Sequence, residues 1–529
     1  MTSGDPPPKP NIVFILADDL GYGDLGCYGQ STIQTPRLDQ LAQQGVRFTQ
    51  FYSGASSCAP ARCVLMTGFH TGHATVRANA SPNTPLRRED ITVAEVLKRA
   101  GYNTALIGKW GLGGEDPNGN PLNVHAAPQN KGFDDAFGYL DQTQAHYYYP
   151  EWLWRNGVKE FIPENYGGAK KTNSHDLFTD EALNYVTNAA EPFYLQLSYT
   201  VPHKYLYDCP LNPQYTGQPW PDIEKRFASM ITRMDTDIGR IVDAIDARGI
   251  GSNTLIIFSS DNGPQQTEGH LAEFFDSNGP LRGIKFTLYE GGIREPFIAR
   301  WTGTISAGTS SDHIGAFEDF LPTAADIAGV KAPSGIDGIS FLPTLTGQGA
   351  QQQHTHLFWE YNDIKAVRWG NWKAVKIDSQ LALYDLATDI SEQDDVAEQN
   401  PSVVTQMELL ISGSHGGVTG VTNPILSLTG DVQGSEDVYL MDFGDFQEGG
   451  DPITLNFQVR NDAQSYSNLM EGQVTAAQIT DPRLSVQEGN YAYLVDGSDS
   501  DIFSVTFTPT SDDPIHGQYA IITGLKYVY

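Results

Sequence analysis

The stretch Asn11-Ile-Val-Phe-Ile-Leu-Ala17-Asp18-Asp19 decides the fold class, because a continuous apolar run ends there in two carboxylates. The run has no polar alternation after Asn11, which predicts a strand buried on both faces, as in a parallel sheet. Open α/β sheets bind their ligands at the carboxyl ends of such strands. Adjacent carboxylates repel one another unless a cation lies between them, so the pair favours a hard cation, with two turn aspartates as the alternative.

A second apolar run, Thr254-Leu-Ile-Ile-Phe-Ser-Ser260, ends in a similar polar pair, Asp261 and Asn262. Gly263-Pro264 then forces the chain to turn. Two buried strands would thus deliver four oxygen-bearing side chains to one edge of a sheet. With no thiol pair nearby, this set favours Ca²⁺ or Mg²⁺ over zinc.

Helix and strand patterns alternate along the first part of the chain. Helices are predicted at residues 35–45, 91–100, 228–245 and 320–329, and further strands at residues 46–52, 104–108, 193–198 and 297–300. This alternation predicts an α/β fold with a large, mostly parallel sheet flanked by helices.

The remainder of the chain has a different texture. Antiparallel strands are predicted between residues 357 and 377, and a last helix at residues 403–411, which together make a small α+β subdomain. From about residue 412, Gly and Ser increase and short strands recur, which predicts a β-sandwich. The expected domains are therefore residues 11–345, 346–412 and 413–529.

Composition and charge exclude some functions. The 529 residues carry a formal net charge of -31, which argues against nucleic-acid binding and disfavours an anionic membrane surface. No run of about 18 apolar residues occurs, so we expect no membrane span. The polar, Pro-rich start resembles a trimmed terminus without a signal peptide. We expect export to the periplasm or the extracellular space, with the signal peptide outside this sequence.

The stretch Cys58-Ala-Pro-Ala-Arg62-Cys-Val-Leu-Met-Thr67-Gly68 has the features of a helix that carries a nucleophile at its N-terminus. The unpaired N–H groups of a first turn favour an anion beside Cys58, and Pro is tolerated early in a helix. Arg62 lies one turn later on the same face and offers a planar fork to an oxyanion. The alternative is a buried structural cysteine beside a surface arginine.

Two further features lie near the predicted strand ends. Lys109 directly follows the strand at residues 104–108, where it is either a solvated charge or part of a site. Residues 130–154 are rich in aromatic side chains and include His146, and we expect a loop wall that stacks on sugar or aryl rings, with packing in the core as the alternative. The aromatic residues are Phe133, Phe137, Tyr139, Tyr147, Tyr148, Tyr149, Trp152 and Trp154.

Together these motifs resemble type I sulfatases of the alkaline-phosphatase-like superfamily, from about residue 11 to the helix at residues 403–411. The motifs that carry the resemblance are Cys58-x-Pro60-x-Arg62 with Thr67-Gly68, Ala17-Asp-Asp-Leu-Gly-Tyr-Gly23, Gly108-Lys-Trp110, Ser260-Asp-Asn-Gly-Pro264 and Leu281-Arg-Gly-x-Lys285. The C-terminal tail resembles Ig-like accessory domains, most clearly at residues 503–510.

The resemblance implies a chemistry for Cys58. In this family a formylglycine-generating enzyme oxidises the motif cysteine to formylglycine, which hydrates to a diol. One diol oxygen, bound to Ca²⁺, attacks sulfur and releases the alcohol, and the other expels sulfate as the aldehyde re-forms. The aromatic loop, the acidic surface and the predicted sandwich tail favour a sulfated carbohydrate as the substrate, from a polysaccharide or its oligosaccharides.

The resemblance also assigns roles to individual residues. It makes Asp18, Asp19, Asp261, Asn262 and the modified Cys58 the ligands of one Ca²⁺ ion. Arg62 would orient the diol, Lys109 and Lys285 would hold sulfate oxygens, and His203 would protonate the leaving oxygen. These cations would make the site locally positive, so that a chain with a net negative charge can bind an anionic sulfate group.

One position departs from the family pattern, since Gly111 replaces the histidine of Lys-Trp-His that assists sulfate elimination. We hypothesise that His146 takes this role, with substrate contact or simple packing as its alternatives. Two other functions stay open: a phosphate or phosphonate monoester hydrolase of the same superfamily, and a non-catalytic sugar-binding protein with Cys58 unmodified. The sequence leaves the sugar, the sulfate position and the oligomeric state open.

Overall fold

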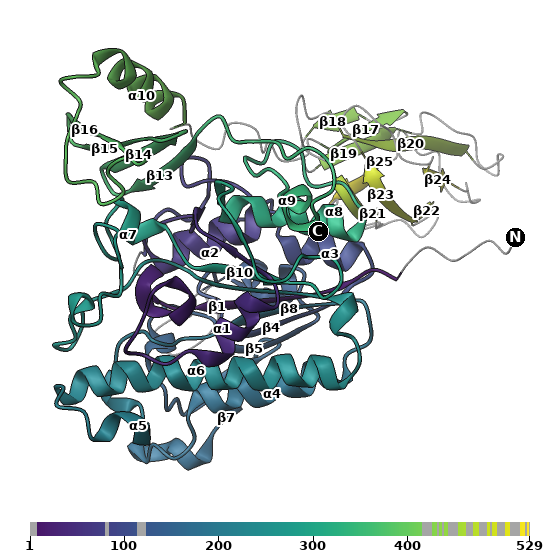
Figure 1. Ribbon diagram of the computed structural model, residues 1–529. Coiled ribbons are helices and arrows are strands. Elements are labelled where there is room, and N and C mark those ends of the chain that lie inside the picture. Colours follow the sequence, from purple (N-terminus) through teal and green to yellow (C-terminus); the bar gives the residue numbers. More distant parts are fainter. Residues whose placement is uncertain are drawn as a thin grey trace, which may run out of the picture. The chain divides into compact units, whose positions relative to one another are not determined.

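The computed structural model describes residues 8–79, 84–113 and 123–414, and the backbone of the strands between residues 426 and 527 (Figure 1). The chain divides into two compact units. The first consists of Met1–Ala332 and Ile336–Val418, and the second of Thr419–Tyr529 with Pro333–Gly335. All the predicted site residues belong to the first unit.

A ten-stranded mixed sheet, in the order β11-β2-β10-β9-β1-β8-β4-β5-β6-β7, forms the centre of the first unit. The adjacent strands β9, β1, β8, β4 and β5 run parallel, and antiparallel pairs lie on either side of them. The strands are β1 (Asn11–Ala17), β2 (Val46–Phe48), β4 (Asn103–Lys109), β5 (Asp135–Tyr139), β6 (Trp152–Arg155), β7 (Val158–Phe161), β8 (Phe193–Ser198), β9 (Thr254–Ser260), β10 (Phe297–Arg300) and β11 (Thr309–Ser311). The predicted mostly parallel α/β sheet is confirmed.

Helices cover both faces of this sheet, which is why β1 is buried throughout. Figure 1 shows α1, α4 and α6 on one face and α2, α3 and α8 on the other. Val13 and Ile15 pack in the core on the first side, whereas the ring of Phe14 meets Phe320 of α8 at 4.7 Å. The helices are α1 (Pro36–Gln43), α2 (Cys58–Thr67), α3 (Val93–Arg99), α4 (Ser174–Asn188), α5 (Pro213–Thr216), α6 (Asp222–Ala247), α7 (Glu290–Ile293), α8 (Phe320–Ala328) and α9 (Leu342–Thr346).

The predicted strand at residues 46–52 is two strands. β2 joins the large sheet, whereas β3 (Phe51–Tyr52) pairs with β12 (Gly315–Ala316) in a separate two-stranded sheet. The sequence predicts one strand here because β2 and β3 are both rich in buried apolar residues, so the apolar pattern does not show where one strand ends and the next begins.

The predicted aromatic loop wall at residues 130–154 is wrong for most of its side chains. β5 and β6 occupy much of this segment, and as they extend the large sheet they turn aromatic rings into its core. The buried rings, each at most 4% exposed, are Phe133, Phe137, Tyr139, Tyr148 and Trp154. Of the other three, Tyr147 is exposed and stacks on Tyr205, while Tyr149 and Trp152 are half-buried.

A four-stranded antiparallel sheet forms the rest of the first unit and confirms the predicted small α+β subdomain. Its strands are β13 (Leu357–Tyr361), β14 (Ile364–Trp369), β15 (Trp372–Ile377) and β16 (Gln380–Asp385), in that order. α10 (Pro401–Ser414) packs Met407 and Ile411 against one face of it. The opposite face buries Trp359 against Tyr52 and Leu288.

The second unit contains short antiparallel strands in three small sheets. These strands are β17 (Leu426–Gly430), β18 (Gln433–Ser435), β19 (Val438–Asp442), β20 (Ile453–Asn461), β21 (Leu469–Val474), β22 (Leu484–Val486), β23 (Gly489–Leu494), β24 (Phe503–Phe507), β25 (Tyr519–Thr523) and β26 (Lys526–Tyr527). The β-sandwich and the three domain limits stay predictions. Across the described residues, none of the helices has the length and apolarity that crossing a membrane requires.

Candidate active site

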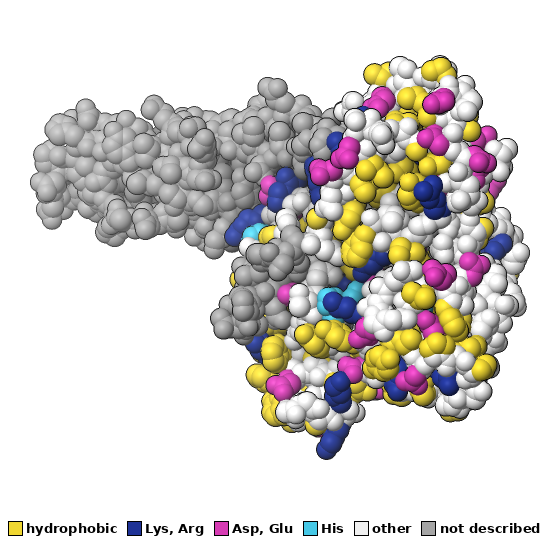
Figure 2. All heavy atoms as spheres, turned by 90° about the vertical axis from the view of Figure 1, so that its left-hand side faces the viewer, with side chains coloured by type: hydrophobic (Ala, Val, Ile, Leu, Met, Phe, Trp, Pro, Cys, Tyr) yellow, Lys and Arg dark blue, Asp and Glu magenta, His cyan; other side chains and the backbone are white. Residues whose placement is uncertain are grey.

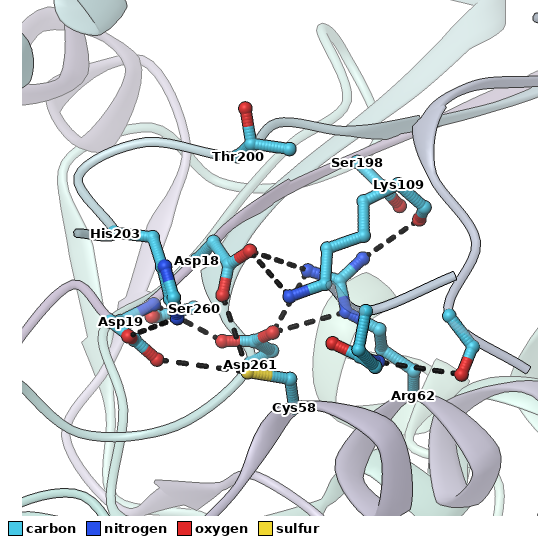
Figure 3. A network of polar contacts seen from close by, with 12 residues as sticks. Asp18, Asp19, Cys58, Arg62, Lys109, Ser198, Thr200, His203, Ser260 and Asp261 are labelled. Atoms are coloured by element: carbon cyan, nitrogen blue, oxygen red, sulfur yellow. Dashed lines mark hydrogen bonds and ion pairs between the residues drawn. The ribbon is translucent and has the colours of Figure 1, made fainter. Parts of the chain in front are cut away.

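The site lies where the parallel strands of the large sheet end. Asp18 and Asp19 follow β1, Asp261 and Asn262 follow β9, Lys109 ends β4, and His203 follows β8. Cys58 begins α2, and Lys285 lies in the loop before α7. Figure 3 shows the labelled members of this group pointing toward one another. Each of these side chains is at most 5% exposed, so the cluster is almost fully dehydrated.

The register of two neighbouring strands brings the acid pairs together. Because Ala17 of β1 pairs with Ser260 of β9, the residues that follow them emerge side by side. The N–H of Asp19 donates to Oδ1 of Asp261 at 3.2 Å, and Nδ2 of Asn262 donates to Oδ1 of Asp19 at 2.7 Å. Asp19 itself has a left-handed backbone, with φ 66°. Such conformations persist where the surrounding structure enforces them, often at functional sites.

Cys58 lies among these acids at the start of α2. Its Sγ lies 3.4 Å from Oδ1 of Asp18 and 3.8 Å from Oδ1 of Asp19, and it accepts a hydrogen bond from Nζ of Lys285 at 3.4 Å. Burial raises the pKa of the Cys58 thiol well above its ordinary range. The unmodified side chain is therefore a neutral thiol at physiological pH, which is a poor nucleophile.

Two lysines neutralise the first acid pair. Nζ of Lys109 donates to Oδ2 of Asp18 at 2.7 Å, and Nζ of Lys285 donates to Oδ2 of Asp19 at 2.7 Å. Burial alone would raise the pKa of Asp18, but Lys109 and the other nearby cations outweigh it and hold that pKa well below its ordinary value. Burial dominates at Asp19, whose pKa is raised.

Arg62 neutralises the second pair. Its Nε and Nη2 donate to Oδ2 of Asp261 at 3.1 and 2.8 Å, and its Nη1 donates to the carbonyl of Lys109 at 2.9 Å. Burial, followed by the charge of Asp18, raises the pKa of Asp261 to about 6. Three carboxylates thus face three cations in an almost fully buried space.

Two histidine rings lie beside the cluster. Nε2 of His203 is 3.2 Å from Oδ2 of Asp19 and 3.2 Å from Nζ of Lys285. The ring of His146 stacks on that of His203, with centroids 4.5 Å apart and planes 8° apart. Burial, reinforced by nearby lysines, lowers the pKa of both rings, to about 3 for His146. His146 therefore lies next to the site, over His203.

The departure at Gly111 has a structural explanation. Gly111 has φ +76°, and a Cβ built there would lie 2.2 Å from Nε2 of Gln142. That amide also donates to the carbonyl of Gly111 at 3.3 Å. Gln142, rather than His146, thus occupies the space next to Gly111. No local pattern in the sequence marks Gln142, because the contact joins two loops.

Tyr148, which the sequence predicts as part of the aromatic loop wall, is buried and supports the site from the core instead. Its hydroxyl donates to the carbonyls of Thr200 at 2.8 Å and His203 at 3.0 Å. Both carbonyls belong to the loop after β8 that carries His203. Tyr148 therefore fixes the backbone of that loop from the core.

The residues present can hold a metal ion. Ligand atoms of Asp18, Asp19, Cys58 and His203 all lie within 4.8 Å of one another. Oδ1 of Asn262 is buried, and within the part of the chain that the structure describes no donor reaches it. A buried acceptor without a partner is costly, and a cation is one way to satisfy it. Carboxylate and amide oxygens are the ligands of a hard cation such as Ca²⁺.

Comparison with known proteins points to one family. Residues 10–330 match the sulfatase family, and residues 284–412 match the family described as N-sulphoglucosamine sulphohydrolase, C-terminal. N-acetylgalactosamine-6-sulfatase of Rattus norvegicus is 33% identical over 398 residues, which cover 71% of this chain and 72% of the relative. N-acetylgalactosamine-6-O-sulfatase of Bacteroides thetaiotaomicron is 29% identical over 487 residues, which cover 76% of this chain and 92% of the relative.

Solved structures agree with the sequence relatives. The crystal structure of Ps i-CgsB in complex with k-i-k-neocarrahexaose has a TM-score of 0.67 and 26% identity, and covers 78% of this chain and 94% of that chain. The phosphonate monoester hydrolase of Agrobacterium radiobacter has a TM-score of 0.57 at 21% identity, covering 79% of this chain and 98% of that chain, and shares the fold.

Proposed function

This chain belongs to the sulfatase family and hydrolyses sulfate esters of carbohydrates, and we propose that it does so with a formylglycine at position 58 and a calcium ion beside it. The observation that carries the proposal is the position of Cys58. Its side chain lies at a helix start, in contact with Asp18, Asp19 and Lys285 inside one buried, charge-balanced cluster.

Calcium would be held by Asp18, Asp19, Asp261, Asn262 and the modified residue 58. The four oxygen-bearing side chains come from two adjacent strand ends, and the unpartnered Oδ1 of Asn262 supports a cation among them. When bound, the ion would stabilise negative charge on the oxygen of residue 58 that attacks sulfur. Formation of formylglycine would require a formylglycine-generating enzyme as a maturation partner.

Two of the three cations would bind the sulfate group, and the third would orient the residues around it. Lys109 and Lys285 now donate to Asp18 and Asp19, and both would gain sulfate oxygens as partners once a metal neutralises those acids. Arg62 would keep residue 58 and the Asp261 side chain oriented, because its guanidinium is fixed by three hydrogen bonds. Fixed charges of this kind stabilise a developing anion without reorganising during the reaction.

His203 is placed to move the proton that the leaving group needs. Its Nε2 faces the cluster beside Lys285, and its backbone is fixed by Tyr148. Burial and Lys285 keep the pKa of His203 low in the substrate-free site, and the charge of a bound sulfate group would raise it. We propose that the ring, protonated in that state, donates a proton to the departing sugar oxygen, so that an alcohol leaves rather than an alkoxide. His146, stacked on the same ring, is our candidate for the group that assists sulfate release in place of a side chain at position 111.

A phosphate or phosphonate monoester hydrolase would use similar metal and anion groups, but the family match and the named relatives do not favour it. A non-catalytic sugar-binding protein is disfavoured for the same reason. The sugar, the sulfate position and the cellular location are further parts of the proposal. We propose a pyranose sulfate of a polysaccharide, and export to where such polymers occur.

A substrate panel tests this proposal. The panel contains disaccharides with N-acetylgalactosamine 6-sulfate or 4-sulfate, carrageenan oligosaccharides, and a matched sugar phosphate. We expect the converted enzyme to release sulfate from at least one sugar sulfate and to leave the phosphate intact, with loss of activity in Cys58→Ala. Preferred cleavage of the phosphate, or equal sulfate release by Cys58→Ala, would contradict it.

A further inference from the structure

Two aromatic side chains, Phe286 and Tyr361, lie at the edge of the charged cluster. Phe286 directly follows Lys285, whose Nζ contacts Sγ of Cys58 and lies 5.2 Å from the centre of the Phe286 ring. The rings of Phe286 and Tyr361, the last residue of β13, stack with centroids 5.6 Å and planes 28° apart. Phe286 is nevertheless 45% exposed, so one side of this pair faces solvent.

The backbone at Phe286 is held in a conformation that a bulky residue rarely adopts. Its φ is +70°, in the left-handed region, which is strained for a residue other than glycine. Two hydrogen bonds maintain it: the N–H of Lys285 donates to the carbonyl of Pro264 at 2.9 Å, and that of Phe286 to the carbonyl of Ser56 at 2.8 Å. The fold therefore presents an exposed phenyl ring beside Lys285 at an energetic cost, as ligand-binding segments often do.

Tyr361 gives the pair a fixed base and a polar edge. It packs against the buried core that contains Trp359 and Leu288. Burial raises the pKa of its phenol, and a hydrogen bond with the side chain of Asn362, followed by the charge of Lys285, opposes that rise. Figure 2 shows hydrophobic side chains close to histidine and to Lys or Arg side chains on one face of the molecule.

The chemistry of this surface fits a sugar ring. A pyranose has an apolar face of C–H groups and a rim of hydroxyls, whereas a free anion would gain nothing from a phenyl ring. Aromatic side chains supply flat apolar area, and tyrosine adds a hydroxyl that can hydrogen-bond at the edge.

We propose that the Phe286–Tyr361 pair is the surface on which a pyranose ring of the substrate stacks while its sulfate group enters the charged cluster. This inference rests on the proposed function, because it names how the same site selects the sugar. The pair would hold the sugar and leave the chemistry to the cluster, so its loss acts on KM more than on kcat.

Steady-state kinetics of sulfate release test the pair, with the panel disaccharide that has the highest kcat/KM. Phe286→Gly removes the ring and suits the left-handed backbone, so it keeps the loop intact, and Phe286→Tyr keeps the ring. We expect KM to rise about tenfold in Phe286→Gly and in Tyr361→Ala, the effect of losing about 1.4 kcal/mol of stacking. Phe286→Tyr and Trp369→Ala, which removes a 39% exposed ring at the far end of β14, should keep the wild-type KM.

Competitive inhibition by inorganic sulfate separates the possible outcomes, since free sulfate contacts the cluster without a sugar. An unchanged inhibition constant with a raised KM supports the pair as a sugar surface. An unchanged KM in Phe286→Gly overturns it, as does an equal rise in both constants, which would mean that Lys285 had moved. If the wild-type enzyme releases no sulfate from any panel sugar, the proposed function itself has failed.

Discussion

Gln142 fills the space that a side chain at Gly111 would need, with its Nε2 2.2 Å from the position of a Cβ there. Gln142 thus occupies space that the histidine of Lys-Trp-His would need at this position. The left-handed backbone of Gly111, at φ +76°, adds a second reason for glycine.

Restoring histidine at position 111 should therefore harm the protein. A left-handed backbone costs a residue other than glycine about 1–3 kcal/mol. We expect Gly111→His to lose more than this in the free energy of unfolding, because the histidine side chain would also displace Gln142. Gly101→His is the matched control, because Gly101 has φ +88° and nothing within 4 Å of its Cβ position. Denaturant unfolding of both variants, and of Gly111→His with Gln142→Gly, measures the clash. Equal losses in Gly111→His and Gly101→His would show that Gln142 is not in the way.

Tyr148 should affect turnover through His203. Tyr148→Phe removes the two hydrogen bonds to the carbonyls of Thr200 and His203, and we expect kcat to fall on the order of tenfold, since small displacements of a catalytic group are costly. Tyr28→Phe is the control, because the Tyr28 hydroxyl also donates to two carbonyls, those of Phe48 and Phe297. Tyr28→Phe should lose at least as much stability, because the Tyr28 hydroxyl also accepts from the N–H of Phe297 at 2.9 Å. A similar loss of kcat in Tyr28→Phe would contradict positioning by Tyr148.

A buried ion pair should stabilise the contact of the four-stranded sheet with α7. Nζ of Lys373 donates to Oε1 of Glu290 at 2.9 Å, and both side chains are fully buried. Lys373→Met removes a buried cation that also lies 3.6 Å from Glu392, while Tyr52 and Arg294 still donate to Oε2 of Glu290. Because part of the compensation remains, we expect a loss of about 3 kcal/mol in the free energy of unfolding, the lower end for a broken buried pair. Lys376 and Glu408 form a partly exposed pair. For Lys376→Met we therefore expect a loss of only about 0–1 kcal/mol in the free energy of unfolding. Similar losses in the two variants would exclude the buried pair as the cause.

The pair of His354 with Asp319 should make stability depend on pH. Burial lowers the pKa of His354, but the Asp319 carboxylate, 2.7 Å from Nε2, outweighs it and raises that pKa from 6.5 to about 9. Because the folded pKa is the higher one, the stabilisation is complete below pH 6.5 and is lost as pH rises through about 9.

Thermal unfolding of wild type and His354→Gln between pH 6 and pH 10 measures this effect. Burial raises the pKa of the neighbouring Glu318 to about 8, so the difference between the two proteins is the proper readout. We expect His354→Gln to be the less stable protein at pH 6, with a gap that narrows toward pH 10. A gap that is constant or widens with pH would contradict the assignment.

The sequence predicted those parts of the site that strand ends determine. Asp18-Asp19 and Asp261-Asn262 each follow an apolar run, and parallel strands must bring such ends to one edge, so their meeting followed from pattern alone. Cys58 begins a helix, as its flanking sequence indicated.

What the sequence could not predict depends on contacts between distant segments. Tyr147 and Tyr148 are adjacent and similar, yet Tyr147 is exposed and Tyr148 is buried under the loop of His203. Phe286 also gave no signal, because neither its left-handed backbone nor its partner Tyr361 is encoded nearby in the chain. Tertiary packing determines which of these side chains is buried and which backbone conformation it adopts, and the local sequence pattern does not report that packing.

The dependence of turnover on conversion of residue 58 tests the central claim most directly. Preparations made with and without a formylglycine-generating enzyme would be compared by mass analysis of the peptide that contains Cys58 and by sulfate release from the best panel disaccharide. The account predicts turnover in proportion to the converted fraction, in which residue 58 has lost its sulfur, and none in Cys58→Ala. Equal turnover by converted and unconverted protein would contradict it.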